Sequence, residues 1–368
     1  MSAILDAILT SSRLVVFVGE GGVGKTSTAA ASALAAATGG RCVAALTIDP
    51  APRLGDALGL DSLGGTAGRV HDSEIDDGRG ELWALKLDTQ GTFDAAVESL
   101  APSAEAARVV LGSPIYRAVS GSLGGSDSYM ALQRIHELTD EDLYDLIVVD
   151  TPPALHADEL LSAPLRLDAL METRATSVLA DPAVAVARAG SALARTTAGV
   201  LVGILQRIAG KGMREELARF ITSFEEVIDG LRKRARTVDT LLRQDDCAFV
   251  QVVRPTATSV SGALELRDSL SARGIETAAI VVNRMTPAPG ADRAVSRSER
   301  LQGAPGGVED AVESIEQDLD ALRSSERAAV ALLRQAIGDD IAILEIESLE
   351  HDVAGVDDLS VIARKLME

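Results

Sequence analysis

The sequence predicts an α/β fold built on a doubly wound, mostly parallel sheet that carries an α-helical insertion. Seven short apolar runs rich in Val, Ile and Leu alternate with longer stretches that have helical spacing or turn residues. Of the 368 residues, 46% are hydrophobic but only 2% are aromatic, and alanine is abundant. This composition favours close-packed helices on an aliphatic sheet over an all-β design.

Each predicted strand is a short apolar run bounded by turn residues. The helix after the first strand is expected from Thr26 to about Thr38, because Gly39-Gly40 can supply the left-handed residue that ends a helix. A charged amphipathic helix is expected from Val308 to Ile337. The strands expected, in chain order, are Leu14–Val18, Cys42–Ile48, Leu82–Leu87, Leu146–Val149, Ala248–Val253, Ala278–Val282 and Ile341–Ile346.

The domain organisation follows from the same patterns. A chain of this size can bury one large core, so residues 1–368 are expected to form a single domain. Residues 160–245 show helical spacing without a convincing strand, which predicts a helical insertion within that domain. Residues 286–307 are rich in Pro, Gly and Ala and are expected to form a flexible surface loop.

Charge and cysteine content exclude several classes of function. The net charge of −20 and the pI near 4.6 argue against a nucleic-acid partner, because such binding depends on clustered cations. Cys42 and Cys247 are the only cysteines, too few for a disulfide framework or a cysteine-rich metal site. No N-terminal signal and no apolar run of about 20 residues is visible, so we expect a cytoplasmic protein.

Residues Gly19–Thr26 read Gly-Glu-Gly-Gly-Val-Gly-Lys-Thr, a complete phosphate-binding loop between a predicted strand and a predicted helix. Glycines let backbone N–H groups point at the phosphates, Lys25 would reach the β and γ phosphates, and the Thr26 hydroxyl is a ligand for Mg²⁺. The positive end of the helix dipole faces the same place. The loop residues expected to bind nucleotide are Gly19, Gly21, Gly22, Val23, Gly24, Lys25, Thr26 and Ser27.

Three more polar residues end predicted strands at the ligand-bearing edge of such a sheet. Asp49 follows the second strand and could orient the attacking water, although Asp49-Pro50 alone could equally be a simple turn. Asp150 ends an apolar strand where a Mg²⁺-side carboxylate is required, and residues 154–161 after it would form a γ-phosphate switch. Asn283 ends a later strand, and its amide can donate to and accept from adenine.

Taken in order, the phosphate loop, Thr-Ile-Asp-Pro-Ala, Asp-Thr-Pro-Pro-Ala-Leu-His and Val-Val-Asn resemble the motifs of the arsenical pump-driving and tail-anchored-protein-targeting ATPases. That family includes the bacterial anion-transporting ATPases, and the likeness covers nearly the whole chain. It implies a SIMIBI-like P-loop NTPase fold with a deviant Walker A motif. It also implies ATP and Mg²⁺ as ligands, dimers that close face to face on ATP, and helical insertions that form a shared surface for a client or partner.

The resemblance assigns a role to each matching position. It implies Lys25 and Asp49 as catalytic residues, with Asp49 activating water. Thr26 and Asp150 would lie on the metal side, His156 in the second switch and Asn283 at the base.

One position departs from the family pattern. Members usually carry a signature lysine after the first glycine of the loop, which contacts phosphate across the dimer interface, but here that residue is Glu20. A carboxylate driven toward triphosphate would be repelled, so Glu20 is expected to turn away or face a cation. A missing cation could come from Arg53 or from a different subunit. The chain is therefore expected to form either a homodimer or a heterodimer with a lysine-bearing paralogue.

Three functions remain open on the sequence. The first is a Mg-dependent ATPase that acts as an ATP-gated dimeric switch on a partner protein or membrane component. The second is an ATP-binding regulatory subunit with weak hydrolysis, paired with a lysine-bearing paralogue. The third, a partitioning or septum-placement ATPase, needs a basic DNA surface or a basic terminal helix, which the acidic composition disfavours.

Overall fold

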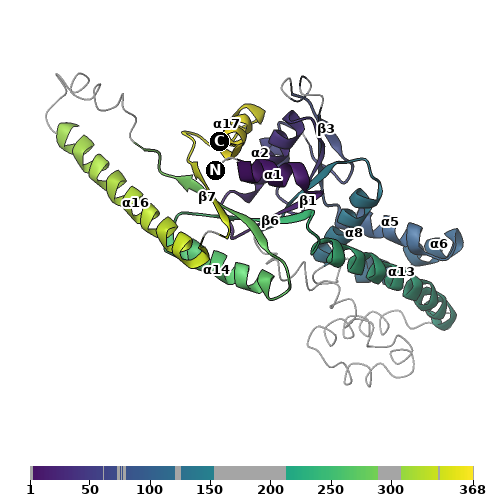
Figure 1. Cartoon of the computed structure of the whole chain (residues 1–368). Coiled ribbons are helices and arrows are strands. Elements are labelled where there is room, and N and C mark those ends of the chain that lie inside the picture. Colours follow the sequence, from purple (N-terminus) through teal and green to yellow (C-terminus); the bar gives the residue numbers. More distant parts are fainter. Residues whose placement is uncertain are drawn as a thin grey trace.

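The computed structural model describes residues 3–60, 62–72, 75, 77, 80–120, 126–152, 213–288, 308–338 and 340–367. Eight strands form one sheet in the order β3-β4-β2-β5-β1-β6-β7-β8, with helices on both faces (Figure 1). Neighbouring strands are parallel except for the antiparallel pair β3 and β4. The predicted doubly wound, mostly parallel sheet is confirmed.

All seven predicted strands are present, and their ends differ from the predicted ones by no more than a few residues. The eighth strand, β3, was missed: it has three residues and pairs along the edge with β4, too short for a period to show. The strands are β1 Leu14–Val18, β2 Cys42–Thr47, β3 Gly68–Val70, β4 Glu81–Lys86, β5 Leu146–Asp150, β6 Cys247–Val253, β7 Thr277–Met285 and β8 Ala342–Glu347.

The central strands are buried on both faces, which explains why they read as continuous apolar runs. In β1, Leu14 and Val16 belong to a core cluster on one face, whereas Val15 and Phe17 belong to a cluster on the other. Strands with two buried faces need helices on both sides. The described helices are α1 Ala3–Ser11, α2 Lys25–Thr38, α3 Arg53–Ala57, α5 Thr89–Leu100, α6 Ala104–Gly112, α7 Pro114–Ser120, α8 Ser126–Asp140, α13 Met213–Leu241, α14 Ala257–Ser271, α16 Val308–Ile337 and α17 Val356–Met367.

Helix α2 runs behind the phosphate loop and packs against α17, α1 and β2 on one face of the sheet. Its small side chains permit this close approach, since Ala30, Ala31 and Ala33 are fully buried. The helix ends at Thr38 as predicted, and Gly40 beyond it has φ 95°, the left-handed conformation that glycine adopts readily.

On the opposite face, α5, α6, α8 and α13 pack together over one half of the sheet, while α14 and α16 cover the other half. Helix α13 supplies Phe220 and Phe224, whose rings stack at 5.1 Å, and Phe224 meets Phe93 of α5 edge-on at 6.3 Å. The predicted insertion over 160–245 is thus helical from 213 to 241, and its first part lies outside the described residues.

Two further expectations concern the segment around β7 and α16. Helix α16 begins at Val308 and ends at Ile337, as predicted. The predicted loop over 286–307 lies outside the described residues except for 286–288. Within the part of the chain that the structure describes, no helix is both long enough and apolar enough to cross a membrane.

Candidate functional site

The phosphate loop joins β1 to α2, and two of its glycines are required by the backbone. Gly19 has φ 146°, and a Cβ there would lie 2.2 Å from the Val252 carbonyl oxygen. Gly24 has φ 99°, and a Cβ there would lie 2.1 Å from the Asn283 amide nitrogen. A side chain at Gly19 would clash with the backbone of β6, and one at Gly24 would push the Asn283 amide aside at a φ that L residues rarely adopt. These glycines therefore fix the curl of the loop against the neighbouring strands.

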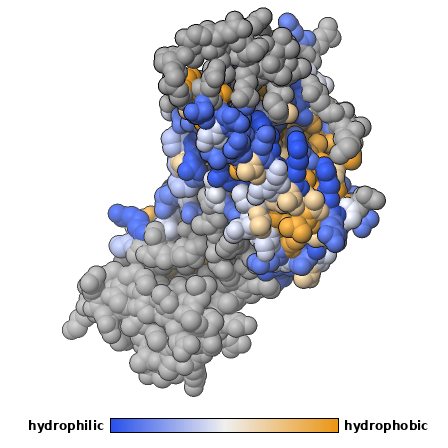
Figure 2. All heavy atoms as spheres, turned by 90° about the vertical axis from the view of Figure 1, so that its left-hand side faces the viewer, coloured by the Kyte–Doolittle hydropathy of each residue, from blue (hydrophilic) through white to orange (hydrophobic). Residues whose placement is uncertain are grey.

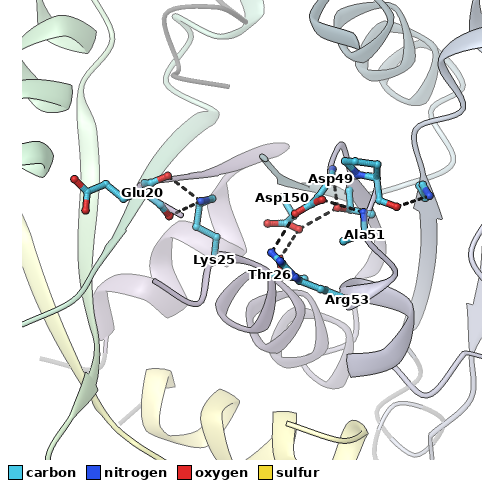
Figure 3. Close-up of polar contacts among 11 residues, drawn as sticks. Glu20, Lys25, Thr26, Asp49, Ala51, Arg53 and Asp150 are labelled. Carbon is cyan, nitrogen blue, oxygen red and sulfur yellow. Dashed lines mark hydrogen bonds and ion pairs between the residues drawn. The ribbon is translucent and has the colours of Figure 1, made fainter. Parts of the chain in front are cut away.

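Lys25 is the first residue of α2 and is only 5% exposed. Its Nζ donates hydrogen bonds to the carbonyl oxygens of Gly19 at 2.8 Å and Glu20 at 2.7 Å (Figure 3). Burial lowers the pKa of the ammonium group, and the nearby carboxylates of Asp150 and Asp49 oppose that effect. A cation is thus held inside the loop at the amino end of the helix.

Asp150, at the carboxyl end of β5, is 1% exposed. Its Oδ2 accepts hydrogen bonds from the hydroxyls of Thr26 at 2.9 Å and Thr47 at 3.0 Å. Its Oδ1 is buried without a hydrogen-bond partner. Burial raises the pKa of the carboxyl to about 6, although both hydroxyls and Lys25 favour the charged form.

This arrangement fits a hard divalent cation. A buried carboxylate oxygen without a partner is costly unless something polar meets it, and the Thr26 hydroxyl lies beside the same carboxylate. Mg²⁺ prefers oxygen ligands, keeps several of its own waters and needs only one or two protein groups. The predicted pair, Thr26 and Asp150, therefore has the donor chemistry for Mg²⁺.

Asp49 follows β2 and is 8% exposed. Its Oδ1 accepts from the backbone N–H of Ala51 at 2.9 Å, and its Oδ2 lies 3.4 Å from a guanidinium nitrogen of Arg53. The first contact is the turn bond that the Asp-Pro reading anticipated. Figure 3 shows Asp49 on the same side of the loop as Thr26 and Asp150, so a turn does not exclude a role at the nucleotide.

Asn283, near the end of β7, reaches back to the phosphate loop. Its Nδ2 donates to the carbonyl of Val23 at 2.8 Å, and its Oδ1 accepts from the backbone N–H of Arg284 at 2.9 Å. An amide has two N–H donors and two lone pairs, so one of each is left for a base. The side chain thus stabilises the loop and still has one donor and one acceptor free in number for adenine, as the sequence predicted.

The site residues come together as the strand order requires. Strands β2, β5, β1, β6 and β7 are neighbours, and the predicted residues of the loop, β2, β5 and β7 meet at their carboxyl edge. Ser27 lies half-buried in the first turn of α2. The predicted switch over 154–161, with His156, lies outside the described residues.

Comparison with known proteins places the chain in a family. The model of the family described as anion-transporting ATPase matches residues 12–368. The chain belongs to the anion-transporting ATPase family. The family is one of ATP hydrolases, and its fold is the P-loop NTPase fold that the sequence predicted.

Three curated relatives of this anion-transporting ATPase illustrate the range of similarity. An uncharacterized protein of Streptomyces coelicolor is 30% identical over 276 residues, which is 75% of this chain and 63% of that protein. The ATPase GET3 of Podospora anserina is 26% identical over 296 residues, 79% of each chain. The ATPase GET3 of Phaeosphaeria nodorum is 27% identical over 274 residues, 73% of this chain and 76% of that protein.

Glu20 turns away from the loop, as expected for a carboxylate beside a phosphate site. Figure 3 shows its carboxylate pointing away from Lys25, although its backbone carbonyl accepts from that lysine. The side chain lies over α14, where a Cβ on Gly262 would come within 2.5 Å of the Glu20 Oε1. The absence of a side chain on Gly262 gives the glutamate room to lie there.

Sequence reasoning missed Thr47, which links the two aspartates. Its hydroxyl donates to Asp150 Oδ2 and accepts from the backbone N–H of Asp49 at 3.2 Å. Thr47 is 1% exposed, so this hydroxyl has no water to replace either partner. A hydroxyl two residues before a strand-end aspartate was the available signal, but any strand can carry threonine there.

We expect Thr47→Val to lower ATP turnover by roughly 10-fold to 100-fold with a smaller change in KM, because Asp49 loses its hydrogen bond to Thr47 while Thr26 still donates to Asp150. It should also lower the free energy of unfolding by about 1–3 kcal/mol, since a buried N–H is left without an acceptor. Thr47→Ser keeps the hydroxyl and should restore most of both. If valine and serine behave alike, the hydroxyl has no positioning role.

For Asn283→Ala we expect ATP binding to weaken by roughly tenfold, the equivalent of one lost hydrogen bond of about 1 kcal/mol or slightly more. The preference for ATP over GTP should fall as well, because adenine offers an N–H donor where guanine offers an acceptor. Competition with unlabelled nucleotides measures both quantities. Equal losses for ATP and GTP would restrict Asn283 to bracing the loop.

Proposed function

We propose that this chain is a Mg-dependent ATPase that works as an ATP-gated dimeric switch on a partner protein or membrane component. The observation that carries the proposal is the juxtaposition of Lys25 inside the loop with the buried pair Thr26 and Asp150. At the amino end of α2, Lys25 offers a cation to the phosphates, and the oxygens of Thr26 and Asp150 offer ligands to a metal. A nucleoside triphosphate chelated with Mg²⁺ presents the matching groups.

Binding would exchange internal contacts for contacts to phosphate. Lys25 now satisfies the carbonyls of Gly19 and Glu20, and its ammonium can turn to phosphate oxygens, to which charge-assisted bonds are stronger. The loop N–H groups and the amino end of α2 supply the remaining donors. Thr26 would give up its bond to Asp150 and place its hydroxyl on the metal.

Mg²⁺, when bound, would neutralise charge on the β and γ phosphates. The protein residues have separate tasks. Asp150, whose Oδ1 has no partner, would hold Mg²⁺ on its side of the site, and Asp49 would orient an attacking water or accept its proton. Thr47 ties the backbone N–H of Asp49 to the carboxylate of Asp150 and so fixes where Asp49 begins. Arg53 beside Asp49 keeps that side chain directed at the site.

Dimerisation is part of the proposal, and Glu20 makes the choice of partner a testable question. A homodimer would place two glutamates where this family usually has lysines, and it would need another cation such as Arg53 at the interface. A heterodimer with a lysine-bearing paralogue would receive that cation from the other subunit. In that case the chain alone would bind ATP but hydrolyse it weakly, which is our second candidate function.

Affinity purification from the native cell, with ATP and an Asp49→Asn variant, tests the assembly. Blocked hydrolysis should keep the closed dimer together long enough for isolation. A lysine-bearing paralogue in the eluate supports the heterodimer, whereas recovery of self-associated chain alone supports the homodimer. A strictly monomeric chain under ATP would overturn the dimeric switch.

A further inference from the structure

Helix α16 carries an apolar stripe longer than the core that it covers. Its second half supplies Ala329, Val330, Leu333 and Ile337 to a core cluster with residues of α14 and β7. Its first half projects beyond the sheet and those elements (Figure 1). Every residue that α16 contributes to the described core lies at or after Ala329.

The stripe nevertheless continues to the start of the helix. Apolar side chains recur at alternating spacings of four and three residues, the heptad period of a coiled coil. At 100° per residue these positions lie within the same narrow arc as the residues buried farther along. We call this set the seam: Val308, Val312, Ile315, Leu319 and Leu322.

Among the residues that the structure describes, three of the five seam side chains are exposed, and Val312 and Leu319 are half-buried. Val308 is 38% exposed, Ile315 58% and Leu322 48%, three of the few large hydrophobic side chains with such exposure. Figure 2 views the molecule from the side toward which α16 projects and shows hydrophobic and hydrophilic residues interspersed on that face. A projecting helical half of this length is marginal in water without a partner. These observations indicate that the seam is a binding surface for another helix.

The charge on the first half of α16 favours a basic partner. Between Val308 and Leu322 the helix has six acidic residues and no basic one. Glu316 and Asp318 flank the seam at the positions where coiled coils place their interhelical ion pairs. A second copy of this helix would bring two strongly acidic segments together, and an anionic membrane surface would be repelled in the same way.

We propose that the first half of α16 is a docking surface for a basic amphipathic helix of a partner protein, which forms a two-helix coiled coil with the seam. Aliphatic side chains of the partner pack between those of the seam. Its lysines or arginines flank the contact and pair with the acidic rim. The inference goes beyond the proposed ATPase function, because it concerns a surface that the nucleotide site does not use.

The test measures binding of a labelled synthetic helix of about three heptads with leucine and valine in its seam and lysine at the flanking positions. A matched peptide has glutamate at the flanking positions. Fluorescence anisotropy with the full chain should show binding at least about tenfold tighter for the lysine peptide, and the affinity should fall with added salt. Equal affinities, or no binding of the lysine peptide, would overturn the proposal.

Variants of the chain locate the site. Ile315→Asp and Leu322→Asp should each weaken binding about tenfold or more, since each removes one apolar contact and adds a charge to the seam. Leu332→Asp is the matched control, because Leu332 is 54% exposed on the same helix but lies outside the stripe. None of the three contributes to a described core cluster, so thermal unfolding and ATP turnover should stay as in the wild type.

Two results would contradict the proposed occupant. If Leu332→Asp weakens binding as much as Ile315→Asp, the peptide does not lie on the seam. If sedimentation shows self-association that Ile315→Asp abolishes, a second copy covers the seam and the basic partner is wrong. Peptide binding and sedimentation do not measure ATP hydrolysis. A wild-type chain that does not hydrolyse ATP would therefore overturn the proposed function but not the docking surface.

Discussion

Replacing Lys25 with alanine should abolish most ATP turnover, with a loss of roughly 100-fold to 1000-fold, the range seen when a preorganised charge-stabilising group is removed. Lys25 is the cation that lies within the loop, 5% exposed and bonded to two loop carbonyls. Its removal takes away the charge that would meet the β and γ phosphates. It also leaves the carbonyls of Gly19 and Glu20 facing the site, which repel phosphate.

Steady-state phosphate release measures this loss, and Lys233→Ala is the matched control. Lys233 is an exposed lysine on α13, so its removal should leave turnover unchanged. Turnover of Lys25→Ala within a factor of two or three of the wild type would mean that the nucleotide does not meet this lysine. A thermal melt of both variants separates a lost contact from a lost fold.

The second large effect is expected from Asp49→Asn, which should lower turnover by roughly 100-fold to 10,000-fold and leave ATP affinity nearly unchanged. Asparagine keeps the oxygen that accepts from the Ala51 N–H, so the turn should survive. It loses the basic carboxylate that would act on the attacking water. The exposed Asp56→Asn on neighbouring α3 serves as the control.

Rapid-quench measurement of bound ATP should show a stable enzyme–ATP complex in Asp49→Asn. Turnover close to that of the wild type would favour the simpler reading, in which Asp49-Pro50 only turns the chain. Weakened ATP binding in this variant would also contradict a role restricted to the water.

The fold was predictable because a doubly wound sheet needs strands that are buried on both faces, which appear as aliphatic runs. The same reasoning failed for β3, whose three residues pair along the edge of β4 and have no period of their own. The end of α2 could be predicted because glycine readily adopts the positive φ that ends many helices, and Gly40 does adopt it. The stripe of α16 predicted a helix but not that the seam in its first half would lie beyond the core.

The residues that lie together at the candidate site could be named from the sequence, but their contacts with one another could not. The sequence pointed to Asp49, Asp150 and Asn283 because each lies at the end of a predicted strand. The carboxyl ends of parallel strands share one edge of the sheet. The bond from Asn283 to Val23 and the bridge through Thr47 depend on how β2, β5 and β7 stand beside the loop. Such tertiary contacts leave no mark in a single sequence.

Calorimetric titration of ATP with and without Mg²⁺, in the wild type and in Asp150→Asn, tests the central claim most directly. The account predicts tight binding to the wild type that weakens at least about tenfold when Mg²⁺ is chelated, and a much smaller effect of chelation in Asp150→Asn. Asparagine still offers an oxygen to Thr26 and Thr47, so the site should keep its shape. No binding heat in the wild type, or an undiminished response to Mg²⁺ in Asp150→Asn, would contradict the account.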